Sequence, residues 1–250
     1  MIGQNNGNDF EWLLIHHTNE NTFSKIPPPI QGTFSTIDNQ IGGTARLSAE
    51  KLGGKGLKKK ADIAIRTEKG QEIRISVKKG SGNSVHQESV SDFIHFLNSE
   101  GASQSQLEQL LFFHWGDGTL DGSGSVDSRL NAIEIRKKYP KTIIEIDSIF
   151  NSCKRAIIER VLLGTGDVSA RPTHLLYSSH CELSNIKIAK MEKVVKFHLE
   201  IENQTLKVGN LNFQAYQRCL QGQEMTSSKN RNDIQFKWPG LSIDIGQING

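Results

Sequence analysis

The sequence predicts an α/β protein in which helices flank a mixed central β-sheet and the C-terminal third is rich in strands. Three observations support this fold class. Apolar and polar residues alternate in two neighbouring runs, Ala61–Arg66 and Glu72–Lys79, with the period of a β-strand. Several segments have the apolar spacing of amphipathic helices. From Thr173 onward the pattern changes to short alternating runs, which indicate further strands.

The first helix is expected to be capped by Asn8, because Phe10 and Leu14 follow it with helical spacing. Glycine and proline then predict mostly loop over Phe23–Leu57, with one helical turn over Thr44–Leu52. The two alternating runs form a hairpin around the turn Glu68-Lys69-Gly70.

Beyond the hairpin, four helices and one strand are expected before residue 165. The helices are predicted over Ser84–Ser99, Gln104–Trp115, Asp127–Tyr139 and Phe150–Leu163, and the strand over Thr142–Ile146. Six C-terminal strands are predicted over Thr173–Tyr177, Ile186–Ala189, Val194–Glu200, Thr205–Val208, Leu211–Ala215 and Asp233–Trp238. Because no linker separates the halves, we expect one domain over residues 1–250, with a catalytic region over 1–165 and a recognition β region over 166–250.

Composition is that of a globular protein, with 250 residues, 23% charged and 36% hydrophobic. The net charge is only +3, yet residues 46–79 hold eleven lysines and arginines against four acids. This local excess suits a polyanionic partner, and a solvated surface patch is the alternative. The three cysteines have no CxxC spacing, which favours a reducing cytoplasm over a zinc site or disulfides. The absence of a signal peptide or a membrane-length apolar run predicts a cytoplasmic protein without membrane contact.

The polar face of the hairpin carries the candidate chemistry. Ser76 and Lys78 alternate with apolar residues on the second strand, and Asp62 lies on the first. A carboxylate can bind Mg²⁺, and a nearby lysine can position water or stabilise charge during phosphodiester hydrolysis. An exposed hairpin with an ordinary lysine and aspartate is the alternative interpretation.

The stretch from Lys58 to Glu88, with SVKKGSGNSVHQE at its end, resembles the PD-(D/E)xK nuclease superfamily and, within it, the type II restriction endonucleases. The resemblance implies a restriction-endonuclease-like fold, with Asp62 as the motif aspartate and Lys78 as the motif lysine. The chain departs from the usual motif at Ser76, where the family has Glu or Asp. By resemblance to S-x-K members of the family, Glu88 on the following helix supplies the missing carboxylate.

Two further regions resemble these nucleases. GNDFEWLL resembles the G-x-x-F-E pattern of their first helix, which implies Glu11 as an outer member of the metal site, with an exposed helix carboxylate as the alternative. LNFQAYQR and IQFKW resemble their C-terminal strands. Gln and Arg can read adenine and guanine edges, and basic residues can hold phosphates. The candidate DNA-binding residues are Lys58, Lys59, Lys60, Lys79, Asn83, His86, Gln87, Gln214, Gln217, Arg218, Lys229, Arg231, Gln235 and Lys237.

The sequence thus predicts a Mg²⁺-dependent type II restriction enzyme that cuts double-stranded DNA. Two-fold symmetric recognition sites favour a homodimer, and a monomer that cuts the strands in turn is the alternative. Two other functions stay open at this stage. One is a nuclease of the same superfamily outside restriction, and the other is a DNA-binding module whose catalytic site has decayed at Ser76.

Overall fold

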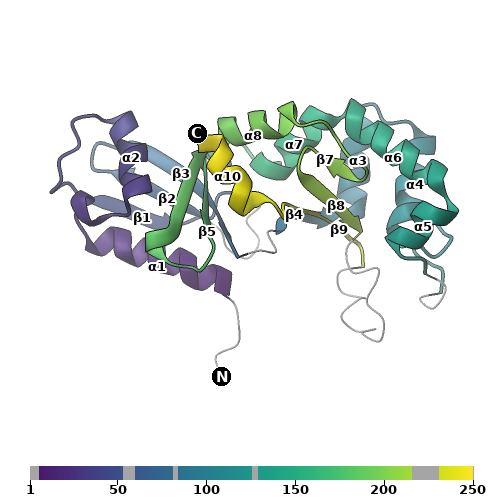
Figure 1. Ribbon diagram of the computed structural model, residues 1–250, viewed down its shortest axis with the longest axis horizontal. Helices are drawn as coiled ribbons and strands as arrows, with labels where there is room; N and C mark the ends of the chain where they lie inside the picture. The colour runs from purple at the N-terminus through teal and green to yellow at the C-terminus, as the bar shows by residue number, and fades with distance from the viewer. Residues whose placement is uncertain (1–5, 53–59, 81–83, 126–128, 216–230, 250) are drawn as a thin grey trace, which may run out of the picture. The chain divides into compact units, whose positions relative to one another are not determined.

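The computed structural model describes residues 6–52, 60–80, 84–125, 129–215 and 231–249 (Figure 1). Its contacts divide the chain into two compact units. The first unit comprises Met1–Asn83, Leu162–Phe197 and Gly240–Gly250, and the second comprises Ser84–Val161 and His198–Pro239. These boundaries differ from the regions 1–165 and 166–250, and the single nuclease domain stays a prediction.

The first unit is built on a five-stranded sheet in the order β1-β2-β3-β5-β6. Its strands are β1 (Leu47–Lys51), β2 (Ile63–Thr67), β3 (Glu72–Lys79), β5 (His174–Ser178) and β6 (Ile186–Lys190). Strands β3 and β5 pair in parallel and the other neighbours pair antiparallel, so the sheet is mixed. The predicted α/β class with a mixed sheet and flanking helices is confirmed.

The hairpin of β2 and β3 forms for the local reasons that the sequence indicates. Gly70 adopts a positive φ of 82° in the turn, which costs glycine little. Its amide donates to the Thr67 carbonyl at 2.9 Å and closes the turn. On β3, Ile73, Ile75 and Val77 are buried in the core, as their alternation predicts.

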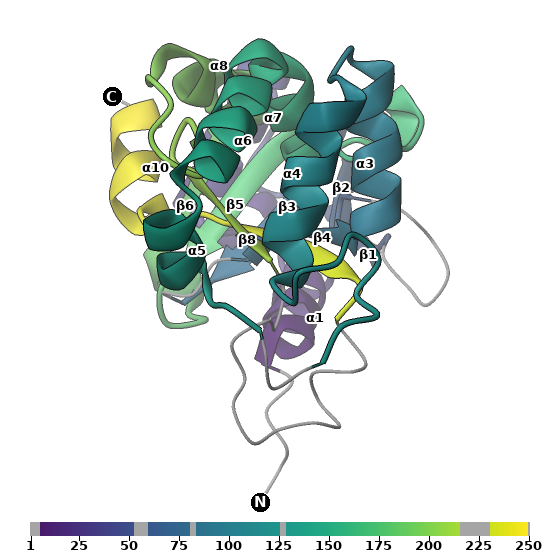
Figure 2. The ribbon, with the colours of Figure 1, turned by 90° about the vertical axis from the view of Figure 1, so that its right-hand side faces the viewer.

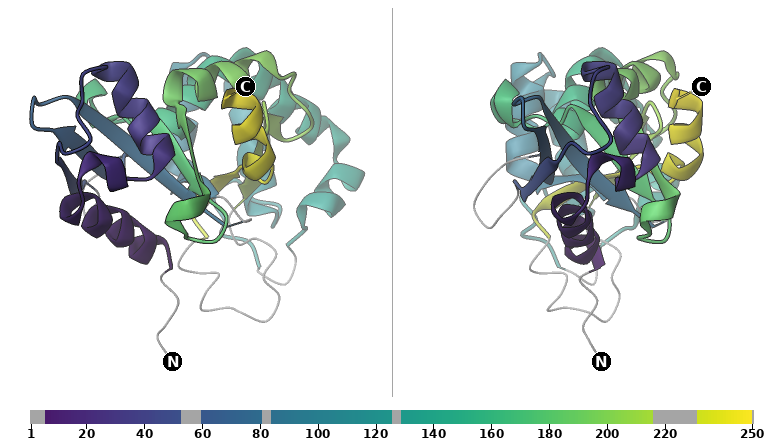
Figure 3. Two further views of the ribbon diagram at one scale, coloured as in Figure 1. Left: turned by 60° about the vertical axis from the view of Figure 1, so that its left-hand side comes forward. Right: turned by 90° about the vertical axis from the view of Figure 1, so that its left-hand side faces the viewer.

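Two helices cover one face of this sheet, as Figure 3 shows in purple. They are α1 (Asn6–Glu20) and α2 (Pro28–Ile37). The core beneath them contains Phe10, Leu14, Ile30, Phe34, Ile63, Ile65, Ile75 and Leu176. At the C-terminal end of the chain, α10 (Leu241–Asn249) packs against β5 and β6.

The predicted loop over Phe23–Leu57 is wrong for much of its length. A 3₁₀ turn at Phe23–Lys25, helix α2 and strand β1 occupy described parts of this segment. Pro28 begins α2, a position where the missing amide costs nothing, and Ile30 and Phe34 are fully buried. Packing therefore overrides the glycine and proline content.

The second unit has a four-stranded antiparallel sheet in the order β4-β9-β8-β7. Its strands are β4 (Ser84–Ser89), β7 (Lys207–Val208), β8 (Leu211–Ala215) and β9 (Asp233–Lys237). Figure 2 shows helices of this unit grouped together, among them α3 (Val90–Ser99), α4 (Gln104–Trp115), α5 (Ala132–Lys138) and α6 (Pro140–Ser152). Phe93, Phe150, Phe213 and Phe236 form its aromatic core, with ring centroids 5.2–6.3 Å apart.

Three sequence predictions are corrected here. Residues Ser84–Ser89 form a strand, and the helix begins only at Val90, where the Ser89 hydroxyl accepts from the Asp92 amide at 3.0 Å. Thr142–Ile146 lies inside helix α6, because Thr142, Ile143, Ile146 and Phe150 are buried with helical spacing. Val194–Glu200 lies inside helix α8 (Met191–Glu200), whose buried residues Met191, Val194 and His198 share one helical face.

Helix α7 (Lys154–Leu163) follows α6 in the chain. The helix predicted over Phe150–Leu163 covers α7 and the end of α6. None of the helices within the described ranges is long and apolar enough to span a membrane.

Candidate functional site

Asp62, Ser76 and Lys78 meet on one side of the β2–β3 hairpin. The Asp62 amide donates to the Ile75 carbonyl at 2.8 Å, which sets Asp62, the residue before β2, opposite the middle of β3. Its carboxylate Oδ2 accepts from the Val77 amide at 2.6 Å and from the Ser76 hydroxyl at 3.3 Å. The side chain of Asp62 thus bonds directly to the β3 backbone, and this fixes its orientation.

Lys78 follows Ser76 on the same face of β3, because alternate residues of a strand share a face. Its Nζ lies 3.9 Å from Asp62 Oδ2 and donates to the Val77 carbonyl at 3.1 Å. The Lys78 side chain is 17% exposed and that of Asp62 is 30% exposed. The ammonium group is therefore held next to a carboxylate that solvent or a substrate can still reach.

The oxygen atoms at this position suit a hard divalent cation. Within the described part of the chain, Asp62 Oδ1 accepts no hydrogen bond. Oδ2 accepts from the Ser76 hydroxyl and the Val77 amide of β3. The same described residues contain no cluster of three or more His, Cys, Asp or Glu side chains suited to a metal. Mg²⁺ commonly takes one or two carboxylates and completes its shell with phosphate oxygens and water, and its binding at Asp62 stays a prediction.

Glu88 is placed differently from its prediction. It lies in β4, not at the start of a helix, and its side chain is only 10% exposed. Arg160 donates to both carboxylate oxygens, with Nε at 2.9 Å from Oε1 and Nη2 at 2.5 Å from Oε2. His86 Nε2 lies 2.9 Å from Oε1. Burial raises the pKa of Glu88, but the hydrogen bonds from His86 and Arg160 outweigh this, and its pKa lies below the ordinary value.

The role of Glu88 as a metal ligand stays a prediction, and its described partners are the Arg160 guanidinium and the His86 ring. A guanidinium that binds both oxygens leaves the carboxylate little capacity for an ion unless the pair opens. No local sequence pattern indicates Arg160 as the partner of Glu88, because the two residues are far apart in the chain.

Glu11 also has a cationic partner. Its carboxylate pairs with Lys51 Nζ at 2.9 Å, and Lys51 donates to Asn8 as well. Lys51 is the register partner of Ile63, on the face that α1 covers. Asp62 aligns with Ser76 on the other face, and no described contact joins Glu11 to Ser76 or Lys78. The role of Glu11 at a metal site stays a prediction.

The basic residues around the hairpin are only partly described. Lys58, Lys59 and Asn83 lie outside the described residues. The stem of Lys60 lies against Gly164, where an added Cβ would come within 2.9 Å of the Lys60 Cβ. Lys79 pairs in register with Ser178 and points to the face opposite Lys78. Their contacts with DNA stay predictions.

Three glutamines form a row across the second sheet. Gln235 on β9 is the register partner of Gln87 on β4 and of Gln214 on β8. Gln87 and Gln214 are exposed, whereas Gln235 is buried and donates to the Ser84 hydroxyl at 2.8 Å. Directly opposite residues share a face, so the three side chains lie on the same face of the sheet.

Lys237 extends this polar face, because it is opposite Asn212 and two residues from Gln235. His86 lies on the other face, opposite the core residue Phe236, and contacts Glu88. Four of the predicted DNA-binding residues, Gln87, Gln214, Gln235 and Lys237, therefore occupy one polar face, and His86 does not.

Arg231 has intramolecular partners that the sequence did not indicate. It pairs with the fully buried Asp117 at 3.0 Å, donates to the Gly122 carbonyl, and lies over the Trp115 ring at 5.4 Å. These contacts tie the start of β9 to the loop after α4. Gln217, Arg218 and Lys229 lie outside the described residues.

Comparison with known proteins identifies the fold. No model of a protein family matches the chain, and no curated protein matches it. Among solved structures, the chain is similar to restriction endonuclease MspI in complex with its cognate DNA. That similarity has a TM-score of 0.58 and 12% sequence identity, and it covers 92% of this chain and 88% of the other. The chain therefore has a restriction-endonuclease-like fold.

Proposed function

We propose that this protein is a Mg²⁺-dependent, sequence-specific endonuclease that hydrolyses phosphodiester bonds in double-stranded DNA. The observation that carries the proposal is the convergence of Asp62, Ser76 and Lys78 on one face of a hairpin in this fold. The structural neighbour is a restriction endonuclease bound to its cognate DNA, and the proposal extends that class of activity to this chain.

Each of the three residues has a distinct proposed role. Asp62 holds the ion, and Ser76, which donates to Oδ2, keeps the carboxylate oriented toward it. Mg²⁺ supplies Lewis acidity and charge neutralisation at a phosphate. Lys78 positions the attacking water or stabilises the negative charge that develops on the phosphoryl oxygens.

Recognition of sequence is proposed for the polar face of the second sheet. Glutamine can make a bidentate pair with adenine, and lysine can contact guanine or phosphate. The exposed Gln214 and Gln87 lie on one surface, with Lys237 beside them in the sheet register. The Gln87 amide donates to Asp233 Oδ2 at 2.7 Å, so it would have to exchange this partner for a base. A homodimer would present two such surfaces to a two-fold symmetric site.

Incubation of plasmid DNA with the protein, with and without Mg²⁺, tests the proposal. Discrete fragments that appear only with Mg²⁺ are the expected result. A smear or nicked circles would indicate a general nuclease, and intact DNA with a gel shift would indicate a DNA-binding module. A Lys78→Ala protein purified in the same way controls for contaminating nucleases.

A further inference from the structure

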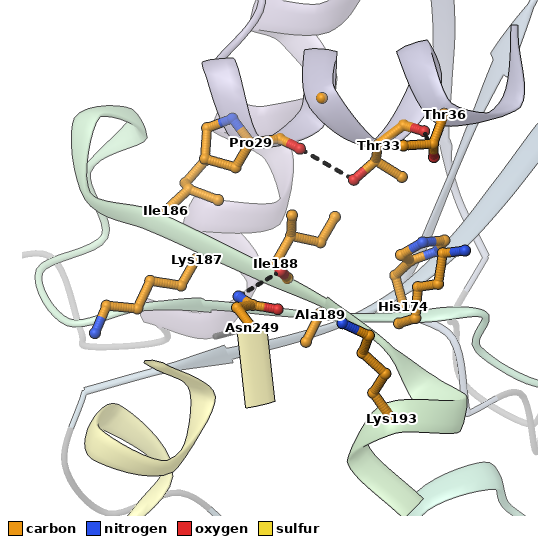
Figure 4. Close-up of a pocket in the computed structure, with 12 residues that line it drawn as sticks. Pro29, Thr33, Thr36, His174, Ile186, Lys187, Ile188, Ala189, Lys193 and Asn249 are labelled. Carbon is orange, nitrogen blue, oxygen red and sulfur yellow. Dashed lines mark hydrogen bonds between the residues drawn. The ribbon is translucent and has the colours of Figure 1, made fainter. Parts of the chain in front are cut away.

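A cavity of about 410 Å³ lies in the first unit, away from the three residues of the proposed catalytic site. Its walls come from α2, β5, β6, α8 and α10 (Figure 4). The volume falls within the rough range of 300–1,000 Å³ that small-molecule sites occupy. The cavity is therefore large enough for a small organic ligand.

All the charged residues described in the lining of the cavity are basic. Lys187, Lys190 and Lys193 line the cavity together with His174, and none of the described lining residues is acidic. Figure 4 shows Lys187 at one end of the cavity and His174 and Lys193 at the other. Lys187 Nζ donates to the Ser242 carbonyl at 3.0 Å, whereas no described acceptor or acid pairs with Lys190 or Lys193. The end at His174 thus attracts an anion.

His174 is the most informative residue of the cavity. It is only 6% exposed, and its Nε2 is buried without a hydrogen-bond partner among the described residues. Burial and the charge of Lys190 lower its pKa to about 4, so the ring is neutral at pH 7. A buried polar atom normally has a partner, and an unpartnered one on a cavity wall points to a ligand.

The hydrogen bond at His174 Nδ1 determines whether Nε2 is a donor or an acceptor. Thr173 Oγ1 lies 2.9 Å from His174 Nδ1, accepts from the Arg74 amide at 2.9 Å, and is also placed to donate to the Arg74 carbonyl at 3.1 Å. When the Thr173 hydroxyl donates to Nδ1, the ring proton is on Nε2, which becomes a donor toward the cavity. An anion beside Nε2 favours this tautomer over the one in which the hydroxyl donates to the Arg74 carbonyl and Nδ1 carries the ring proton.

The remaining walls suit an organic group that carries hydroxyls. Pro29, Ile186 and Ile188 supply apolar surface. The hydroxyls of Thr33 and Thr36 donate to the carbonyls of Pro29 and Thr33, at 3.0 and 2.6 Å, so their oxygens remain acceptors. A ligand hydroxyl can donate to either oxygen.

We infer that this cavity binds a phosphate monoester of a hydroxyl-bearing molecule, with the phosphate between His174 Nε2, Lys190 and Lys193. A phosphate has three terminal oxygens for these three groups, whereas a carboxylate has two. The ester is either a free nucleotide or sugar phosphate, or the 5′-phosphate at the end of a DNA strand. This inference does not depend on the proposed nuclease activity.

Calorimetry on the full chain without divalent ions tests the inference with thymidine 5′-monophosphate, thymidine and inorganic phosphate. Saturable binding of the monophosphate is expected, with weaker binding of phosphate and none of thymidine. Lys190→Gln and Lys193→Gln should each weaken it by about tenfold, the scale of one charged hydrogen bond. Lys187→Gln is the matched control, because the Lys187 ammonium donates to the Ser242 carbonyl at the end of the cavity away from His174. The affinity of this variant for the monophosphate should differ from that of the wild type by less than about twofold.

A second measurement distinguishes the two sources of the ester. A DNA duplex with 5′-phosphates is compared with the same duplex carrying 5′-hydroxyls, in the wild type and in Lys190→Gln. A preference for the phosphorylated duplex that Lys190→Gln removes assigns the site to DNA ends, and binding of the free monophosphate alone assigns it to small molecules. The ring resonances of His174 should shift with either ligand. No binding of either ligand, or binding that both lysine variants leave unchanged, would overturn the inference.

Discussion

Two carboxylates with basic partners, one in each compact unit, differ in how completely the protein satisfies them. Asp62 is 30% exposed, and it pairs with Lys78 Nζ at 3.9 Å. Glu88 is 10% exposed and is bound by Arg160 at 2.5 Å and by His86 at 2.9 Å. We call Asp62 the open site, because its carboxylate is oriented but still reachable from solvent. We call Glu88 the closed site, because its carboxylate is nearly buried and both its oxygens are bonded within the protein.

This difference in exposure and bonding distinguishes a carboxylate that can contact a ligand from one that stabilises the folded protein. A buried carboxylate with a bidentate arginine is satisfied within the protein, and removing one partner leaves the other charge without compensation. A half-buried carboxylate that is held through one oxygen, by a backbone amide and a hydroxyl, retains its other oxygen for an ion. Sequence motifs alone treat Asp62 and Glu88 alike, and the contacts distinguish them.

The largest expected effect is on the open site. Lys78→Ala should lower the rate of DNA cleavage by about 10²–10³-fold or more, because it removes the cation that is proposed to stabilise the reacting phosphate. DNA affinity should stay within about tenfold, since we propose base readout for the second sheet and not for Lys78. Gel assays of cleavage and binding measure the two quantities. Lys69→Ala is the control, because Lys69 lies in the hairpin turn and pairs with Asp38. Cleavage within a few-fold of wild type would remove Lys78 from the mechanism.

Glu88→Gln probes the closed site. It should lower the free energy of unfolding by roughly 3 kcal/mol, because Arg160 stays buried without its counter-charge. Urea denaturation measures this change. Glu159→Gln is the matched control on α7, where the exposed pair with Arg155 should contribute less than about 1 kcal/mol.

The same variant decides between a structural role and metal binding for Glu88. A structural role predicts that the Mg²⁺ concentration for half-maximal cleavage stays unchanged in Glu88→Gln. A steep rise in that concentration with little loss of stability would instead make Glu88 the missing carboxylate opposite Ser76.

Gln214→Ala tests the polar face of the second sheet. If Gln214 reads a base, the change should cost roughly 1–3 kcal/mol of binding to the cognate site and much less on random DNA. Gln104→Ala on the surface of α4 is the control, since its amide bonds to Glu108. Equal weakening on both DNAs would assign Gln214 to the phosphate backbone and remove it from sequence recognition.

The smallest expected effect is a pH dependence that sharpens the comparison. The pKa of Glu88 is lower in the folded protein than its ordinary value of 4.5. Its stabilising contribution is therefore fully present above pH 4.5 and is lost as the pH falls through the folded-state pKa. The stability difference between wild type and Glu88→Gln, measured by denaturation from pH 7 to 3, should shrink below pH 4.5. A difference that grows on acidification would contradict the ion pair.

The sequence by itself determined the β2–β3 hairpin and the placement of Asp62, Ser76 and Lys78. These features depend on local rules, namely the two-residue period of a strand and a glycine in the turn. Helix α4 was likewise predictable over Gln104–Trp115, because Ser103 and Gln106 form its capping box within four residues.

Tertiary structure alone decided the features that depend on distant partners. Ser84–Ser89 suits a helix in isolation, but it becomes a strand because β9, far along the chain, pairs with it. That pairing turns Glu88 toward Arg160 and puts Gln87 in one row with Gln235. The cavity around His174 likewise gathers residues from five elements. Contacts between remote segments set burial and electrostatic partners, and no local periodicity encodes them.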